Sequence, residues 1–106
     1  MKTYEISITE EAMMEEEALF RYLCEKIHAP LTAMRYIAGL RSTIKKLERT
    51  AGTLAKDRTL TRQMGFTVYR TRYKSTAIIY SIEDDMVYIH HIIPQKMVVY
   101  PTSQDK

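Results

Sequence analysis

Hydrophobic residues near the start of the chain follow first the repeat of a strand and then the spacing of a helix. In the segment 3–8, Tyr4, Ile6 and Ile8 alternate with polar residues, which predicts a short strand with one buried face. Thr9 then suits the N-cap of a helix of about 18 residues. The apolar positions of this helix are Ala12, Leu19, Leu23 and Ile27. The acidic run 15–17 interrupts the pattern and is expected to face solvent.

A second amphipathic helix is predicted after a break at 28–30. A residue that precedes a proline disfavours the helical region, whereas a proline fits the first helical turn, so Pro30 should begin the new helix. Gly39 lies in its middle, where glycine costs about 1 kcal/mol relative to alanine, and we expect close packing against the first helix there. Because almost no linker separates the two helices, they should form an antiparallel hairpin. The inward stripe comprises Ala33, Ile37, Leu40, Ile44 and Leu47.

The second half of the chain predicts three strands. Residues 50–65 have no sustained hydrophobic period and suggest a cationic loop with room for a helical turn. The segment "FTVYRTR" (66–72) alternates, "TAIIYSI" (76–82) is a continuous apolar run typical of a central strand, and "MVYIHHII" (86–93) follows an acidic turn. Pro94 should end the last strand, since proline cannot donate to a ladder. The order predicts an α+β fold: an N-terminal strand, then an antiparallel helical hairpin packed on a mainly antiparallel sheet of about four strands.

Length and composition limit the class of protein. A chain of 106 residues fits one domain with one modest core, which we expect over 1–98, with a C-terminal tail at 99–106. No apolar run approaches the roughly 20 residues of a membrane span, and the N-terminus turns acidic at once, unlike a signal peptide. Cys24 is the single cysteine, which excludes an internal disulfide and favours a reducing compartment. We therefore expect a cytoplasmic protein.

Charge is distributed unevenly along the chain. The formal net charge is +3, but residues 1–28 carry three basic and seven acidic side chains, whereas residues 35–74 carry eleven basic and two acidic ones. Such a basic middle beside an acidic start suggests a polyanionic partner, either a nucleic acid or an acidic peptide. A solvated helix face followed by a charged loop has the same composition and is the alternative interpretation.

The end of the last predicted strand carries a histidine pair. If the strand alternates strictly, Val87, Ile89, His91 and Ile93 share the face that the helices cover, and Tyr88 and His90 lie on the open face with Ile92. RNA cleavage by a 2′-hydroxyl needs groups that accept and donate protons and cations around the phosphate. His90 could exchange protons and Tyr88 could stack on a base. The alternative is that both histidines are ordinary sheet residues.

The remaining candidate residues lie around the same strand end. In an RNA-cleaving site, His90, Lys96 and Tyr100 would form the catalytic set, and Tyr88 and three cations of the strand before the central one would bind RNA. These cations are Arg70, Arg72 and Lys74. The three histidines lack metal-site spacing with cysteines or carboxylates, and no glycine-rich phosphate loop occurs, so we expect no metal and no cofactor.

Four segments of the chain together resemble a known family. They are "YEISITEEA" (4–12), "ALFRYLCEKIHAPLTAMRYIAGLRSTIKKLE" (18–48), "VYRTRYKSTAIIYSIEDD" (68–85) and "MVYIHHII" (86–93). Their order and spacing resemble the RelE/ParE superfamily of small toxins from bacterial type II toxin–antitoxin systems, from about Tyr4 to Lys96. The resemblance implies the fold predicted above, a separate acidic antitoxin as partner, and one of two toxic activities. One branch of the family cleaves messenger RNA in the ribosome, and the other poisons DNA gyrase without catalysis.

The chain departs from the ribonuclease pattern at positions that matter for activity. That branch often has an arginine three residues before the tyrosine of the middle strand, which is Tyr80 here, and this chain has Ala77 instead. Lys96 and Tyr100 match the family's basic residue and tyrosine only approximately. Where many relatives have a glycine and paired arginines, this chain has "PQKMV" (94–98) with one cation. The resemblance is therefore compatible with a ribosome-dependent ribonuclease, with a gyrase-type binding toxin, and with an inactive relative that only binds its antitoxin.

Overall fold

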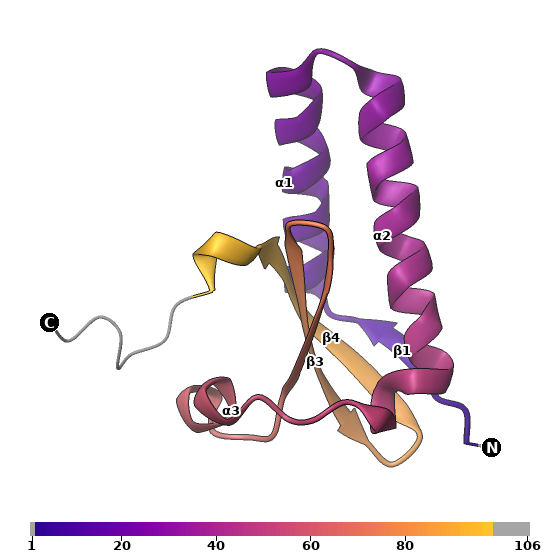
Figure 1. Ribbon diagram of the computed structural model, residues 1–106, viewed down its shortest axis with the longest axis vertical. Helices are drawn as coiled ribbons and strands as arrows, with labels where there is room; N and C mark the ends of the chain where they lie inside the picture. The colour runs from indigo at the N-terminus through magenta and orange to yellow at the C-terminus, as the bar shows by residue number, and fades with distance from the viewer. Residues whose placement is uncertain (1, 99–106) are drawn as a thin grey trace, which may run out of the picture.

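The computed structural model describes residues 2–98, apart from the side chains of Ile27 and Met97. In the described residues a four-stranded sheet has the order β1-β4-β3-β2 (Figure 1). Its strands are β1 (Glu5–Ile8), β2 (Tyr69–Tyr73), β3 (Thr76–Glu83) and β4 (Met86–Pro94). β1 is parallel to β4, and the other neighbours are antiparallel. This arrangement confirms the predicted α+β fold with a mainly antiparallel sheet.

The two long helices form the expected hairpin. Helix α1 (Glu10–Ile27) begins at Thr9, whose hydroxyl accepts the N–H of Ala12, and it ends at His28 in the left-handed conformation. Helix α2 (Pro30–Thr50) has proline in its first turn, as predicted. The end of the hairpin where α1 and α2 join extends beyond the sheet (Figure 1). Only the other half of the hairpin therefore has strands to pack against.

The main core lies between the hairpin and the sheet. Leu40 and Ile44 of α2 are buried there, as predicted, and burying each such side chain stabilises the fold by about 1.5–3 kcal/mol. The hydroxyl of Tyr80, the largest fully buried side chain, donates to the carbonyl of Ala51, so burial leaves no unsatisfied polar atom there. The sheet contributes Ile78, Tyr80, Val87, Ile89 and Ile92, with Ile37 and Ile82 partly buried beside them.

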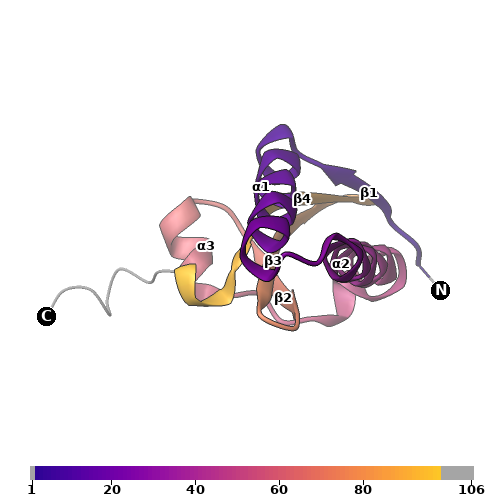
Figure 2. The same cartoon turned by 90° about the horizontal axis from the view of Figure 1, so that it is seen from above.

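A second, smaller cluster covers the other side of the sheet. Helix α3 (Arg58–Met64) starts at Asp57, whose carboxylate accepts the N–H of Leu60, and stops at Gly65 with a positive φ. Figure 2 shows α3 on the opposite side of β3 from α2. Leu60 packs there with Val68 and Ile79. The sequence predicted only a loop with room for a helical turn here. A seven-residue helix with one buried apolar side chain shows no repeating hydrophobic period that could reveal it.

The acidic run 15–17 does not face solvent as a whole, contrary to the prediction. Glu16 is buried at 7% relative exposure, and its carboxylate binds the guanidinium of Arg41 on α2 through two hydrogen bonds. Such a bidentate pair fixes both distance and orientation between the helices. Glu15 contacts β4, and only Glu17 is exposed. One helical turn therefore ties α1 to both α2 and the sheet.

Gly39 packs closely, but against the sheet and not against α1. A Cβ atom at this position would lie 2.8 Å from Cε1 of Tyr73 in β2 and closer still to the tyrosine hydroxyl. Tyr73 is itself held by an edge-to-face contact with Tyr36, at 5.0 Å between ring centroids. The glycine therefore lets a β2 aromatic side chain reach the surface of α2.

We predict that Gly39→Ala destabilises the protein, although alanine is the better helix former by about 1 kcal/mol. The added methyl group overlaps the Tyr73 ring, and overpacking of this kind typically costs about 1–3 kcal/mol. Urea unfolding should show a lower midpoint for Gly39→Ala, and a second change, Tyr73→Ala, should remove the penalty of the added methyl. A midpoint that rises in Gly39→Ala alone would contradict the contact.

Candidate functional site

An open groove of about 1120 Å³ lies between α1, the turn that joins β2 to β3, and the end of β4. Apolar side chains of α1 border this space on one side, and the end of β4 borders it on the other. Leu19 and Leu23 line the helical side, and Ile92 and Ile93 line the sheet side. We refer to this cavity as the groove. Its size and apolar walls make it the main candidate for a binding surface among the described residues.

Large apolar side chains are exposed beside the groove. Tyr22 of α1, which lines the groove, is 55% exposed, and Leu31 and Met34 in the first turns of α2 are 59% and 57% exposed. Contiguous exposed apolar surface on a small protein commonly marks an interaction site. The far end of the hairpin thus carries further exposed apolar side chains.

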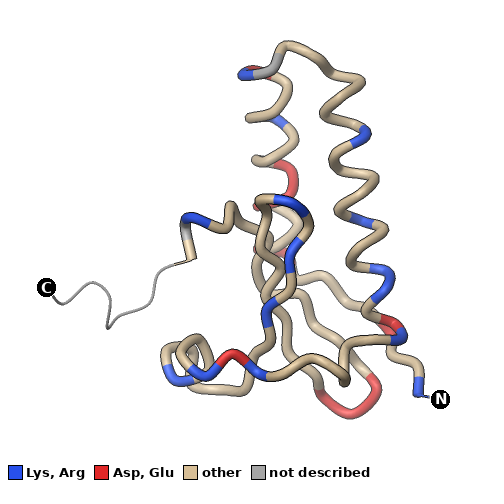
Figure 3. The backbone as a smooth tube through the Cα atoms, in the orientation of Figure 1, with Lys and Arg blue, Asp and Glu red and all other residues tan. Residues whose placement is uncertain are grey.

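Three of the predicted RNA-binding and catalytic cations lie at the groove. Arg72, Lys74 and Lys96 all line it, and Figure 3 shows basic positions following β2 into the β2–β3 turn. The Arg72 guanidinium donates to the carbonyl of Lys74 at 3.3 Å. Lys74 itself has a positive φ in the turn. The turn therefore presents Arg72 and Lys74 on one wall of the cavity, whose lining also includes Glu15 and the polar residues Ser75, Thr76 and Gln95.

Arg70 has a different environment from these cations. Its Nε lies 3.7 Å from a carboxylate oxygen of Asp57, the N-cap of α3, and its side chain is 33% exposed. This ion pair joins β2 to the start of α3. Arg70 is not among the residues that line the groove.

No sequence pattern pointed to Tyr22 or Tyr36, which both line the groove. The Tyr36 hydroxyl lies 2.8 Å from the hydroxyl of Thr76, and both residues line the groove. Tyr22 and Tyr36 look like ordinary helix-face aromatics in the sequence. Only the position of the β2–β3 turn beside the hairpin makes them part of a site.

A β-bulge changes which face of the sheet the isoleucines after it occupy. Ile79 pairs with His91 but Tyr80 pairs with Ile89, so His90 is an extra residue in β4. The predicted alternation is therefore wrong after Ile89. Ile92 joins the core under the hairpin, and Ile93 packs with the cluster beside α3.

His90 lies in a partly buried position on the side of Phe66. Its Nε2 is 2.7 Å from the Ser81 hydroxyl, and its ring meets the Phe66 ring edge-on at 5.2 Å. Burial lowers the pKa of His90, the electrostatic interaction with His91 acts in the same direction, and Glu11 opposes both. The imidazole of His90 is therefore neutral at pH 7. His90 does not line the groove that Lys96 and Arg72 share.

The other members of the predicted set are spread out. Tyr88 is half-buried within β4, where it pairs with Ser7 and Ser81 on the neighbouring strands. Tyr100 lies outside the described residues. The structure thus brings Arg72, Lys74 and Lys96 together, and holds His90 and Tyr88 in the sheet.

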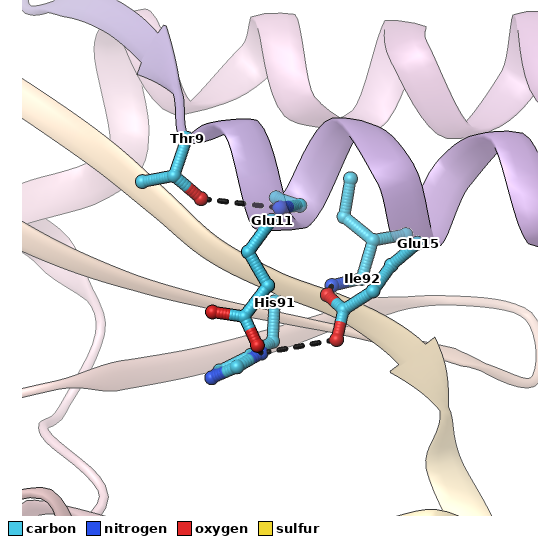
Figure 4. A network of polar contacts seen from close by, with 6 residues as sticks. Thr9, Glu11, Glu15, His91 and Ile92 are labelled. Carbon is cyan, nitrogen blue, oxygen red and sulfur yellow. Dashed lines mark hydrogen bonds and ion pairs between the residues drawn. The ribbon is translucent and has the colours of Figure 1, made fainter.

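His91 meets two carboxylates of α1 (Figure 4). Its Nδ1 lies 3.2 Å from Glu15 and 3.9 Å from Glu11. The other oxygen of Glu15 accepts the N–H of Ile92 at 2.9 Å. The backbone explains this contact, since β1 pairs with β4 only as far as Ile89 and α1 then takes its place. One ligand atom from each of Glu11, Glu15 and His91 lies within 4.8 Å of the others, so these residues could hold a metal ion.

The fold matches that of a solved structure. A search of solved structures finds "Chromosomal ParDE TA system from P. aeruginosa" at a TM-score of 0.74 and 14% sequence identity, covering 87% of this chain and 96% of that chain. No protein-family model matches the sequence, and no curated protein matches it. The match confirms the fold that the sequence resemblance predicted. None of the described helices is long and apolar enough to span a membrane.

We predict that His90 makes stability depend on pH. Because its pKa is lower in the folded protein than the ordinary value of 6.5, the unfolded chain takes up a proton more readily as the pH falls. This contribution to stability is complete above about pH 6.5 and is lost as the pH falls toward the folded pKa. In His90→Gln, urea unfolding should therefore lose less stability than wild type between about pH 7.5 and pH 5. Parallel curves for the two proteins would contradict the burial effect.

Proposed function

We propose that this chain is the toxin component of a two-protein toxin–antitoxin system, and that its groove holds a segment of the antitoxin. The observation that carries this proposal is the groove itself, where apolar walls from α1 and β4 meet the cations Arg72, Lys74 and Lys96. Such a surface suits a segment with one apolar face and acidic residues beside it. An antitoxin of this kind acts on a cytoplasmic toxin, so we also propose a cytoplasmic location.

The size of the groove favours a peptide over a small molecule. Small-molecule pockets usually measure about 300–1,000 Å³ and bury most of their ligand, whereas this groove has about 1120 Å³ and is partly open to solvent. An amphipathic helix placed in an apolar groove is a recurrent mode of peptide recognition. A disordered acidic segment that folds on binding would gain from apolar burial and from attraction to Arg72, Lys74 and Lys96 at the groove.

The fold similarity supports the same proposal by analogy. The matched structure is described as a toxin–antitoxin system, and nearly all of that chain is covered by the match. Folds are shared among proteins of different function, so the analogy raises the expectation of an antitoxin partner and the groove provides the physical basis.

Inhibition by binding is the better-supported mode of toxicity. Ala77 is fully buried and pairs with Arg72 and Ile93, so the arginine that the ribonuclease branch often has here would have no space in this fold. The Nε2 of His90 is engaged by Ser81, away from the cations of the groove. We therefore propose that the free toxin binds an essential protein, such as DNA gyrase, and does not cleave RNA.

Ribosome-dependent RNA cleavage is the second candidate. It is favoured by the cluster of Arg72, Lys74 and Lys96, which has the charge to hold a phosphate backbone. The lowered pKa keeps His90 able to accept a proton near pH 7. In this mode Lys96 and Arg72 would hold the phosphate, Arg70 and Lys74 would attract RNA, and Tyr88 or Tyr100 would orient a base.

We predict that an acidic protein encoded beside the gene co-purifies with this chain and binds it through the groove. The double change Arg72→Glu and Lys96→Glu should weaken binding at least about tenfold, equivalent to about 1.4 kcal/mol, because it replaces attraction by repulsion. Titration calorimetry at two salt concentrations measures the loss.

The matched control reverses two exposed arginines of α3 instead, in Arg58→Glu and Arg62→Glu. This variant has the same net charge as the first, so it should retain most of the affinity. An equal loss in both variants would show that net charge and not the groove governs binding. Failure to recover any small acidic protein would refute the toxin–antitoxin assignment.

Growth and transcript assays separate the two modes of toxicity. If the chain inhibits by binding, induced expression should arrest growth while messenger RNA stays intact, and His90→Ala should arrest growth equally. A general acid–base residue typically contributes about 10²–10⁴-fold, so in a ribonuclease the same change would abolish cleavage. Fragmented transcripts that depend on His90 would therefore overturn the binding mode, and absence of growth arrest would identify an inactive relative.

A further inference from the structure

We propose that Glu11, Glu15 and His91 form a binding site for a divalent transition-metal ion, for which Zn²⁺ is the natural probe. The site joins the first two turns of α1 to β4 just after the bulge (Figure 4). Its two carboxylates and one imidazole are a donor set that suits Zn²⁺ and its neighbours in the first transition row. The proposal does not depend on the proposed function, since it rests only on these three side chains and their supports.

The distances between the donor atoms fit one small ion. Ligand atoms bound at about 2.0–2.2 Å to a tetrahedral zinc lie about 3.4 Å from one another. Nδ1 of His91 lies 3.2 Å from Oε2 of Glu15 and 3.9 Å from Oε2 of Glu11, and all three ligand atoms fall within 4.8 Å. Glu11 is 69% exposed, so its side chain can make the small inward movement that closes the set.

Glu15 is already oriented as a ligand by the backbone. Its Oε1 accepts the N–H of Ile92 at 2.9 Å, which leaves Oε2 directed to His91. A hydrogen bond to the second oxygen of a ligating carboxylate is the usual support around metal sites. The β4 bulge supplies the other fixed element, because it sets the position of His91 beside α1. Two of the three donors are thus held in place by the fold.

The charges at this point also favour a cation. Glu11 and Glu15 are one helical turn apart on α1, and like charges at this spacing repel each other. The Thr9 cap and the helix N-terminus offset part of the repulsion for Glu11. A protonated His91 would neutralise one carboxylate, whereas a divalent ion would neutralise both. Three protein donors leave a fourth position of a tetrahedral ion for water, as in open zinc sites.

Calorimetric titration of Zn²⁺ into tag-free, metal-free protein tests the site. We expect one ion to bind per chain. His91→Ala and Glu11→Gln should each lower the affinity at least about tenfold, since even the loss of a hydrogen-bond partner behind a metal ligand costs about 10–100-fold. Glu11→Gln alters an exposed side chain and should leave the far-ultraviolet circular dichroism unchanged. Binding should also raise the melting temperature of wild type, and the rise should increase with the free Zn²⁺ concentration.

Two matched variants serve as controls. His90→Ala removes the neighbouring histidine, whose Nε2 faces Ser81, and Glu17→Gln removes an exposed carboxylate of the same helix. Both should bind Zn²⁺ as wild type does. The proposal is overturned if wild type binds no Zn²⁺, if Glu11→Gln binds as tightly as wild type, or if His90→Ala loses as much affinity as His91→Ala. Any of these results would leave the cluster as an ion pair between α1 and β4.

Discussion

The rest of the structure depends on how β4 is covered along its outer edge. Its first half pairs with β1 as far as Ile89, and beyond that point the chain has already turned into α1. A strand that loses its partner exposes backbone donors, and an unpaired buried N–H is costly. Here Glu15 of α1 accepts the N–H of Ile92, so a helix side chain continues the role of a strand. The Glu15 side chain thus replaces a strand as the partner of β4. This contact fixes α1 against β4 and brings the carboxylates of Glu11 and Glu15 to His91.

The groove follows from the different lengths of hairpin and sheet. The half of the hairpin that contains Leu40 and Ile44 packs on strands, whereas the half where α1 and α2 join continues past them (Figure 1). The apolar residues of that far half cannot all be buried within the described residues, and Tyr22, Leu31 and Met34 stay largely exposed. The bidentate pair between Glu16 and Arg41 holds the two helices together near this transition. A largely apolar groove with cations along one wall is the result.

The two faces of the sheet pack into different hydrophobic clusters. The hairpin face holds the large core around Tyr80 and Leu40, and the opposite face holds the smaller cluster around Leu60 and Ile79. After the bulge at His90, Ile92 faces the core under the hairpin and Ile93 faces the cluster beside α3. Bulges commonly re-aim side chains beside functional sites, and here the bulge puts Ile92 and not Ile93 into the core under the hairpin.

The sequence by itself determined the elements whose pattern repeats. The stripe from Ala33 to Leu47 recurs at helical spacing, and the run 76–82 is continuously apolar, so both elements and much of the core could be predicted, as could the gathering of cations near Arg72. Burial of repeated positions is a local property that a sequence displays directly.

Only the tertiary structure decided the features that depend on pairing between distant segments. The bulge at His90 arises from the register with β3, and the contact between Glu15 and His91 joins residues 76 positions apart. The burial of Glu16 depends on Arg41 of the other helix. Helix α3 depends on Leu60, which packs with Ile79 of β3. Gly39 indicated close packing, but the partner could not be named, since no local pattern relates α2 to Tyr73. Such contacts are chosen by geometry across the fold, because their energy comes from groups that become neighbours only when the chain has folded.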